Sequence, residues 1–154
     1  MSDSARLAVD EDLSSFMHLH SLSRLGIEGH KGSDLWIERK SLNSKSEDLF
    51  TQLLSNERYG CILGLYENCP FGFLIAELTE LYGKTSVDIH EVFVEADARK
   101  VGIGESMMEC LIEWAKERSA KSITSRALPG DRELKNYFER YKLTARLIEV
   151  ERIL

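Results

Sequence analysis

Apolar residues recur every three to four positions in four stretches of this chain, which is the spacing of helices with one buried face. The predicted helices cover residues 12–25, 46–56, 104–120 and 131–141. The third helix is the most regular and has an apolar and an acidic face. Its apolar face carries, at four-residue steps, Ile103, Met107, Leu111 and Ala115. Its acidic face carries, at the same steps, Glu105, Glu109, Glu113 and Glu117. Residues 29–46, with two glycines and several serines around Trp36, are predicted as a loop or a broken helical turn.

Other stretches are rich in β-branched and aromatic residues and are bounded by turn residues, which predicts strands. They cover residues 6–9, 59–66, 71–81, 85–94, 122–127 and 143–153. Short connections at 67–70 and 83–84 predict antiparallel hairpins between the second, third and fourth strands. Strands and helices follow one another in the order βααβββαβαβ, in a single domain expected to span residues 1–154.

Composition and charge exclude several classes of protein. Of the 154 residues, 43% are hydrophobic and 30% are charged, as in an ordinary globular protein. The net charge of -6 argues against a nucleic-acid partner, which needs a contiguous basic surface. No leader-like start and no stretch near ~18 apolar residues is present, so we expect a cytoplasmic protein without a membrane partner. The three cysteines lack the spacing of disulfides or zinc ligands, so no metal is expected.

The passage from strand to helix at residues 92–104, with the sequence VFVEADARKVGIG, carries the most chemical information. Gly102 and Gly104 have no Cβ atom, so the backbone can bend tightly there and approach a ligand closely. The N–H groups in the first turn of a helix have no intrahelical partner, and the positive end of the helix dipole lies beside them. This helix start is therefore predicted to bind a phosphate group.

Two common nucleotide-binding loops do not fit these residues. A Rossmann fingerprint would need Gly or Ala where Met107 stands, and the Gly-Lys-Ser/Thr of a Walker loop is absent. The stretch resembles instead the Arg/Gln-x-x-Gly-x-Gly/Ala signature of the GNAT superfamily of acyl-CoA-dependent N-acetyltransferases, with Arg99, Gly102 and Gly104 in the signature positions. The element order and the segment 137–140, Tyr-Phe-Glu-Arg, which is similar to the family's Phe-Tyr-Glu-Arg, extend the resemblance over nearly the whole chain.

This resemblance implies an α/β fold of the α+β type, with a mixed, mainly antiparallel, twisted sheet of about six strands flanked by about four helices. A splayed slot is expected between the strands ending at Val94 and Ala127. The implied cofactor is acetyl-CoA, whose acetyl carbonyl and pantetheine arm would contact the backbone of Val92, Phe93 and Val94. Its pyrophosphate would lie on Arg99, Lys100, Val101, Gly102, Ile103, Gly104 and Glu105, with Asn136 as a further contact.

The implied reaction is direct attack of a primary amine, of a small molecule or a protein, on the thioester. An alkyl ammonium with a pKa near ~10.4 is less than about 0.1% neutral at pH 7, so a base is useful. Glu91 is the first candidate, because strict alternation places it on the face of Ile89 and Phe93, where burial would raise the pKa of a carboxyl group. The alternative is a structural glutamate held by N–H groups or a cation. His90 is then expected on the other face, in packing or at the surface.

The acid that protonates the departing thiolate is where this chain departs from the family. The usual tyrosine falls at Phe138 and the usual asparagine at Asp131, while the glycine that follows the helix in the family is Lys142. Tyr137 or Tyr141 could supply the proton, or water could, because a thiol with a pKa near ~8.5 is a good leaving group. The alternative is that Leu134 and the aromatic residues of this helix form a core stripe.

Phe138 also motivates a second functional hypothesis, a GNAT-like module that binds acyl-CoA for regulation with little or no catalysis. A third is an interaction subunit whose glycine turn is merely a tight connection. Residues 26–45 and the turn at Gly83 are expected to shape the acceptor site, and the identity of the acceptor is left open. The assembly state is also open, with a homodimer as the commonest alternative to a monomer.

Overall fold

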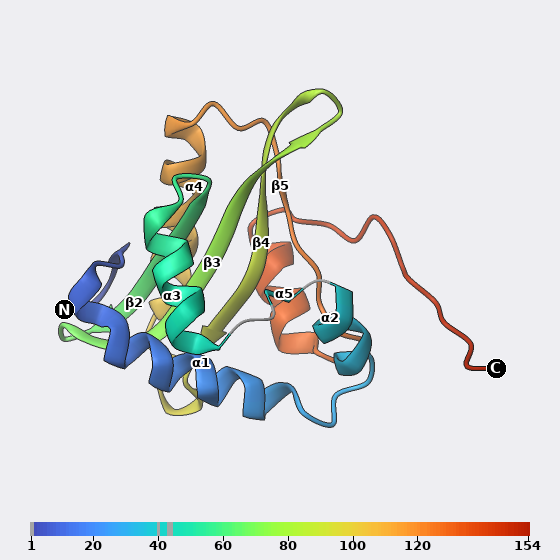
Figure 1. Ribbon diagram of the computed structural model, residues 1–154, viewed down its shortest axis with the longest axis horizontal. Coiled ribbons are helices and arrows are strands. Elements are labelled where there is room, and N and C mark those ends of the chain that lie inside the picture. Colours follow the sequence, from blue (N-terminus) through green and yellow to red (C-terminus); the bar gives the residue numbers. More distant parts are fainter. Residues whose placement is uncertain (1, 40, 43–44) are drawn as a thin grey trace.

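The computed structural model describes residues 2–39, 41–42 and 45–154. Its centre is a twisted sheet in which the strands lie in chain order, as Figure 1 shows. The five strands are β1 (Asp3–Leu7), β2 (Tyr59–Tyr66), β3 (Cys69–Leu81), β4 (Lys84–Val94) and β5 (Ile123–Thr124). The first four pair antiparallel and β5 pairs parallel to β4, so the sheet is mixed and mainly antiparallel, as the sequence predicts.

Helices cover both faces of the sheet (Figure 1). They are α1 (Leu13–Ile27), α2 (Ser33–Arg39), α3 (Ser46–Ser55), α4 (Ile103–Glu117) and α5 (Arg132–Arg140), with short 3-10 helices η1 (Asp10–Asp12) and η2 (Ala96–Ala98). On one face, α1 and α3 bury Phe16, Leu49 and Phe50 against the sheet. On the other face, α4 and α5 bury Met107, Leu111, Trp114, Tyr137 and Phe138.

Helix α4 lies unusually close to the sheet because β2 presents glycines beneath it. A Cβ atom on Gly64 would lie 2.4 Å from Cγ2 of Ile103, and one on Gly60 would lie 2.8 Å from the Trp114 ring. The face of α4 that carries Ile103, Met107 and Leu111 is completely buried, which confirms the predicted amphipathic helix. Close packing along its length fixes the position of the N-terminus of α4.

A β-bulge in β4 changes which side chains face which helices. Ile75 of β3 pairs with Glu91 and the next residue, Ala76, pairs with Ile89, so His90 is one extra residue in β4. Before the bulge Ile89 packs in the α4 cluster, whereas after it Phe93 packs in the α1–α3 cluster. The prediction that Glu91 shares a face with Ile89 is therefore wrong, because strict alternation assumes an unbroken ladder.

Three other sequence predictions differ from the structure. Residues 143–153, predicted as a final strand, form neither helix nor strand, so the sheet has five strands where about six were expected. The strand predicted at 122–127 is reduced to Ile123–Thr124. Residues 29–46, predicted as a loop or a broken helical turn, contain the seven-residue helix α2, while residues 40 and 43–44 lie outside the described residues.

The connection after α5 also has a simple backbone explanation. Lys142 adopts a φ of 66°, the left-handed conformation that glycine takes without strain. Lys142 stands where the family has a glycine, and the chain makes there the kind of turn that a glycine would make. Across the described part of the chain, no helix has the length and apolar character needed to cross a membrane.

Candidate active site

Strands β4 and β5 separate and leave a wedge between them. Their backbone pairing is limited to Val87 with Ile123 and Asp88 with Thr124, although β4 continues to Val94. Beyond that point side chains bridge the gap: Ser125 Oγ and Arg126 Nη1 donate to the carbonyl oxygen of Ile89, at 3.0 and 3.2 Å. The last residues of β4 thus keep a backbone edge directed at the wedge, as the predicted slot requires.

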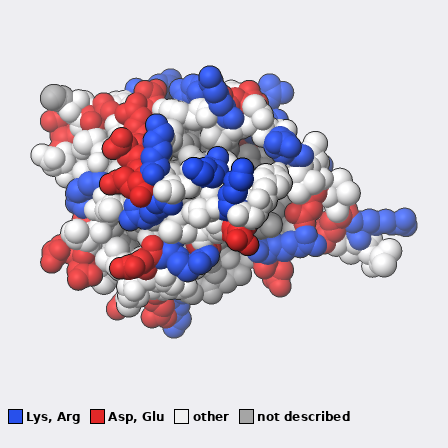
Figure 2. Space-filling model, turned by 90° about the horizontal axis from the view of Figure 1, so that it is seen from above, with Lys and Arg blue, Asp and Glu red and all other residues white. Residues whose placement is uncertain are grey.

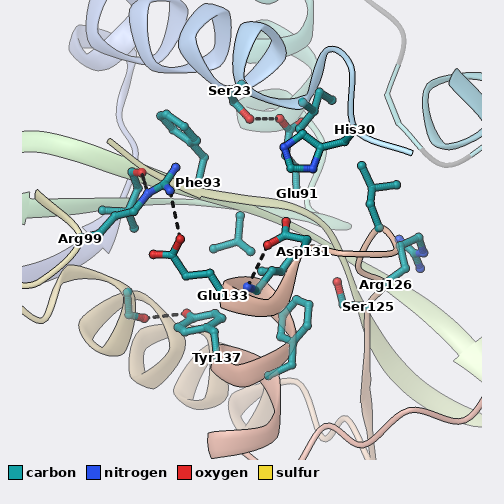
Figure 3. A pocket seen from close by; sticks show the side chains of 18 of the residues that line it. Ser23, His30, Glu91, Phe93, Arg99, Ser125, Arg126, Asp131, Glu133 and Tyr137 are labelled. Atoms are coloured by element: carbon teal, nitrogen blue, oxygen red, sulfur yellow. Dashed lines mark hydrogen bonds and ion pairs between the residues drawn. The ribbon is translucent and has the colours of Figure 1, made fainter. Parts of the chain in front are cut away.

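A cavity of about 630 Å³ occupies this wedge and extends from the start of α4 to α1 and α2. In Figure 3 the helix that carries Ser23 lies above the pocket, and α5 lies below it with the chain at Ser125 and Arg126 to its right. Its walls come from five regions of the chain: Ser23, Gly26, Ile27, His30 and Trp36; His90, Glu91, Val92, Phe93 and Val94; Arg99, Lys100, Gly102, Gly104 and Glu105; Ser125, Arg126 and Leu128; and Asp131, Glu133, Leu134, Tyr137, Phe138 and Arg140.

One end of the cavity is formed by the turn that starts α4. Gly102 has a φ of 85° and caps the helix, and a Cβ atom there would lie 3.1 Å from the Asp3 carboxylate. The first intrahelical hydrogen bond runs from Ser106 N to Gly102 O, so the N–H groups of residues 103–105 precede the helical ladder. These donors and the positive helix end form a candidate anion site.

Arg99 lies beside this anion site and is held by contacts within the chain. Its Nε donates to the carbonyl oxygen of Val94 at 2.8 Å, and its Nη1 lies 3.2 Å from Glu133 Oε2, as drawn in Figure 3. The guanidinium also stacks against the Phe93 ring at 5.9 Å. Because both charged groups of the Arg99–Glu133 pair are exposed, the pair adds little stability and Arg99 can turn to an anionic ligand.

At the other end, the Glu91 carboxylate is buried against α1. Ser23 Oγ donates to Oε2 at 2.6 Å, and Arg24 Nη2 donates to Oε1 at 3.1 Å. Burial raises the pKa of Glu91 above its ordinary value, while Arg24 and Ser23 act in the opposite direction. Glu91 is therefore a desolvated carboxyl group, as the base hypothesis expects, and it is also held by a cation, as the structural alternative expects.

Because of the bulge, the neighbouring residues His90 and Glu91 lie on the same side of the sheet. His90 Nε2 lies 2.7 Å from Glu77 Oε1, and Glu77 is on the α1–α3 side of β3. His90 lines the cavity, so its predicted position on the opposite face from Glu91 is wrong for the reason given above. Two neighbouring ionisable side chains of β4, rather than one, therefore line this end of the cavity.

Behind Glu91 lies a second histidine, His20, which is buried. His20 Nδ1 is 2.7 Å from Ser46 Oγ, and its Nε2, which has no hydrogen-bond partner among the described residues, is 3.9 Å from Glu91 Oε1. Burial, together with the nearby charge of Arg24, lowers the pKa of His20 to about 4. His20 is therefore neutral at physiological pH and adds no positive charge beside Glu91.

The two tyrosines predicted as proton donors occupy different positions. The Tyr137 hydroxyl donates to the carbonyl oxygen of Gly104 at 2.6 Å, and burial raises the pKa of Tyr137 well above its ordinary value. A Cβ atom on Gly104 would lie 3.1 Å from the Tyr137 ring, so this glycine allows α5 to approach α4. Tyr141 caps the end of α5 and is not part of the cavity wall.

Most of the predicted cofactor-binding residues meet at the cavity. Val92, Phe93, Val94, Arg99, Lys100, Gly102, Gly104 and Glu105 line it, whereas Val101, Ile103 and Asn136 do not. Ile103 is completely buried under the sheet, so only its backbone is available to a ligand. Within residues 2–39, 41–42 and 45–154, no group of three or more His, Cys, Asp or Glu residues could hold a metal ion.

Some residues of the site have no local signal in the sequence. Ser23 lines the cavity from α1, and Arg24 beside it binds Glu91, about 70 residues later in the chain. His30 and Trp36 also line the cavity, and they lie within residues 26–45, which the sequence places at the acceptor site. The Trp36 ring stacks under the Arg24 guanidinium at 5.2 Å. Arg126, from the other side of the wedge, is paired with Asp88. Only the three-dimensional arrangement brings these side chains together.

The surface charge agrees with the composition. Figure 2 shows Lys and Arg side chains intermingled with Asp and Glu on the face seen from above. Such a mixture is common on the surfaces of folded proteins and differs from the broad basic surface that binds a nucleic-acid backbone.

Comparison with known sequences points to one family. The model for the acetyltransferase (GNAT) family matches residues 29–141, which is well over half of the chain. An uncharacterized N-acetyltransferase of Archaeoglobus fulgidus is 27% identical over 119 residues, which cover 75% of this chain and 76% of that protein.

Solved structures with the same fold include two acetyltransferases. AAC(6')-Iy in complex with the bisubstrate analogue CoA-S-monomethyl-acetylneamine has a TM-score of 0.75 at 13% identity, covering 99% of both chains. A ribosomal-protein-alanine N-acetyltransferase from Brucella melitensis biovar Abortus 2308 has a TM-score of 0.71 at 15% identity, covering 100% of this chain and 99% of that one. At these identities the likeness concerns the fold.

Proposed function

Because this chain belongs to the acetyltransferase (GNAT) family, we propose that it transfers an acetyl group from acetyl-CoA to the primary amine of a small molecule or a protein. The observation that carries the proposal is one continuous cavity with an anion site at one end and a buried carboxylate at the other. The solved relative bound to a bisubstrate analogue of CoA supports the choice of cosubstrate.

The residues around the wedge fit coenzyme A. The donors at the start of α4 suit its pyrophosphate, and Gly102 gives the backbone the left-handed turn that exposes them. The edge of β4 from Val92 to Val94 faces the cavity and is available to the amides of the pantetheine arm. Phe138 and Leu134 supply an apolar wall beside it. The thioester would then lie near the middle of the cavity.

Glu91 is assigned the role of the base. The amine nitrogen forms the new amide bond as the carbon–sulfur bond breaks, and the proton lost by the amine passes to Glu91 directly or through a water molecule. Desolvation raises the pKa of Glu91 and so makes it a stronger base, while Arg24 and Ser23 hold its two oxygen atoms in place. His90 lies beside this path and can share the proton.

In this proposal, water supplies the proton that the departing thiolate takes up. Tyr137, the tyrosine nearest to the turn, already donates its proton to Gly104 O, and Phe138 has none to give. A thiol with an ordinary pKa near ~8.5 leaves readily without a dedicated acid. In this proposal Tyr137 positions the start of α4, and Tyr141, at the end of α5, takes no part in the reaction.

The compartment is inferred from the cysteines, and the kind of acceptor is inferred from the residues at one end of the cavity. Three free cysteines are compatible with the reducing cytoplasm, where we place the protein. The acceptor end is lined by Trp36, His30 and Glu91, which suit a cationic amine next to an apolar group.

Replacing Glu91 by Gln tests the proposal. We expect kcat for acetylation of a panel of primary amines to fall by about 100-fold or more, with little change in CoA affinity, because the base is lost while the anion site is intact. The matched control is Glu133→Gln, an exposed carboxylate of the same cavity, which should keep most of kcat. Equal turnover in the Glu91→Gln variant would remove Glu91 from the mechanism.

The alternative is a module that binds acyl-CoA without efficient catalysis, motivated by Phe138 at the family's tyrosine position. Calorimetry with CoA and thiol release from acetyl-CoA separate the two functions. Tight CoA binding without turnover on any amine would favour the module, and the absence of CoA binding would contradict both.

A further inference from the structure

His20 is a buried polar side chain that neither the anion site nor the proposed reaction uses. Its imidazole is almost completely buried and packs against the rings of Phe16, at 5.4 Å, and Phe73, at 6.0 Å. Nδ1 lies 2.7 Å from Ser46 Oγ, whereas Nε2 has no hydrogen-bond partner among the described residues. A buried polar atom without a partner is costly, so its presence in a folded protein requires an explanation.

A second atom of this kind lies one helical turn away. Arg24 follows His20 by four residues on α1, so the two side chains leave the same face of the helix. Arg24 Nη2 donates to Glu91 Oε1, but Nε of the same guanidinium is buried and lacks a hydrogen-bond partner in the part of the chain that the structure describes. Both side chains adjoin one oxygen atom, Glu91 Oε1, which lies 3.9 Å from His20 Nε2.

The spacing of these atoms suits one buried water molecule. A separation of 3.9 Å is too long for a direct hydrogen bond, and it is short enough for a single water molecule to contact both His20 Nε2 and Glu91 Oε1. Such a water would accept a hydrogen bond from Arg24 Nε and donate one to Glu91 Oε1. With His20 Nε2 as its third partner it would make three hydrogen bonds, which is typical of buried water.

His20 has the chemistry that such a water needs. A neutral imidazole has one N–H group and one lone pair on its two nitrogen atoms, and the hydroxyl group of Ser46 can either donate or accept. Nε2 can therefore be a donor or an acceptor, whichever the water requires. The packing of Phe16 and Phe73 against the ring limits its rotation, so Nε2 stays directed at Glu91.

The water would complete the support of the Glu91 carboxylate. Ser23 Oγ donates to Oε2 at 2.6 Å, as Figure 3 shows, and Arg24 Nη2 donates to Oε1 at 3.1 Å. Each oxygen atom of a carboxylate can accept two hydrogen bonds. A second donor at Oε1 would fix that oxygen and stabilise the ionised form of the group.

We propose that His20 is a positioning residue for Glu91 and that it acts through one buried water molecule, held by His20 Nε2, Arg24 Nε and Glu91 Oε1. The water stays bound during the reaction, and none of its bonds is broken. The effect on turnover rests on the proposed role of Glu91 as the base, whereas the water site is a property of the resting protein.

High-resolution crystallography of the protein without CoA tests the water site independently of activity. We expect density for one water molecule within hydrogen-bond distance of all three atoms. It should remain in His20→Gln, whose amide can reach the position of Nε2, and disappear in His20→Asn, whose shorter amide reaches only the position of Nδ1. Well-ordered side chains with no water between them would overturn the proposal. Crystals of the parent protein decide this even if His20→Asn does not fold.

The pH profile of kcat/KM tests the positioning role. In His20→Asn we expect kcat/KM at pH 7 to fall by about 10-fold and the acid limb to move to higher pH by about one unit, because the carboxylate loses a donor. The other charged or titratable groups that face Glu91 are unchanged: Arg24 from α1 and His90 from β4, with Glu77 of β3 behind His90. His20→Gln should restore most of kcat/KM and the limb of the parent protein.

The exposed His18 on the same helix provides the control, because His18→Asn should leave the profile unchanged. CoA binding by calorimetry should be the same in every variant, which shows that the cavity is intact. Equal losses in His20→Gln and His20→Asn would reduce His20 to a packing role and overturn the proposal, as would a parental profile in His20→Asn. Unchanged turnover in Glu91→Gln would instead overturn the proposed base, and the crystals alone would then decide the water site.

Discussion

At the scale of single residues, the proposed base lies next to one extra residue in β4. His90 is the bulge, and its side chain and that of Glu91 lie together on the side of the sheet that faces α1. There the Glu91 carboxylate meets Ser23 and Arg24, which hold it in a single position. A carboxylate fixed by two partners would need little reorganisation to act as the base that we propose.

His20 makes a prediction about pH and stability. In the unfolded chain a histidine binds a proton near pH 6.5, whereas His20 in the folded chain does so at about 4. Between these values only the unfolded chain carries the proton, so stability is lost as the pH falls from 6.5 towards 4, by up to about 3 kcal/mol. In His20→Gln the fall should be smaller.

Urea unfolding at pH 7, 5.5 and 4 measures this difference. The matched control is His18→Gln, an exposed histidine on the same helix, which should follow the parent protein at every pH. The contribution of Glu91 to the pH dependence is present in all three proteins, so the comparison largely removes it. Parallel pH curves for His20→Gln and the parent would contradict the low pKa of His20.

At the scale of elements, the contact between α4 and the sheet sets the position of the anion site. Gly64 is the closest point, and an alanine there would push Ile103 away from β2. We expect Gly64→Ala to destabilise the protein by about 1–3 kcal/mol, as overpacking does in other cores. Gly26→Ala is the control, since α1 has open space at that position and alanine favours a helix by about 0.5–1 kcal/mol. Chemical denaturation should show opposite signs for the two changes.

The contact between α5 and α4 gives a second prediction at this scale. Tyr137→Phe removes one buried hydrogen bond to Gly104 O and should cost about 1–2 kcal/mol of stability. If Tyr137 only positions α4, kcat at saturating acetyl-CoA should change by less than about threefold. Tyr141→Phe, at the end of the same helix, should alter neither quantity. If turnover by Tyr137→Phe instead fell by about two orders of magnitude while CoA affinity was retained, its hydroxyl would be the acid after all.

Much of the architecture follows from local patterns in the sequence. The amphipathic helix α4 and the two hairpins of β2, β3 and β4 are specified by periodicity and turn residues, and the structure confirms them. The bulge at His90 could not be predicted, because it leaves the alternation of apolar residues ambiguous. Residues 143–153 have the pattern of a strand but no partner strand in the described chain, and a pattern alone does not supply one.

The candidate site also combines a part that the sequence predicts with a part that it does not. The turn from Arg99 to Gly104 is a short local motif, so the sequence places it correctly before α4. The partners of Glu91, by contrast, come from α1. Contacts between residues so far apart in sequence depend on the packing of the whole sheet, and no spacing rule along the chain encodes them. The roles of Glu91 and Tyr137 stay predictions until the variants are measured.

At the scale of the whole molecule, the wedge is built into the sheet and does not have to open. Ser125 and Arg126 hold its two sides together through Ile89 O, while both helical layers pack around it. Coenzyme A would therefore bind a formed cavity and stabilise the folded protein. At a concentration of about 100 times Kd, binding adds about 2.7 kcal/mol, which for a chain of this size corresponds to a rise in Tm of about 5–10 °C.

Differential scanning fluorimetry with and without CoA measures that rise. The Glu91→Gln variant should show the same increase, because its anion site is intact. Gly102→Val should show a much smaller rise in Tm, since a valine with a backbone φ of 85° is strained and its side chain would meet the Asp3 carboxylate. An equal increase for Gly102→Val would separate CoA binding from the turn at α4.

The bulge has an evolutionary consequence. If the codon for His90 were lost, Glu91 would follow Ile89 directly, and the ladder with Ile75 and Ala76 would become regular with every later side chain still on its present side. Such a descendant would keep the carboxylate on the α1 side and the glycine turn before α4. It would lose one imidazole and the local bend that a bulge gives a strand, so a single deletion could straighten β4 without moving the proposed base to the other face.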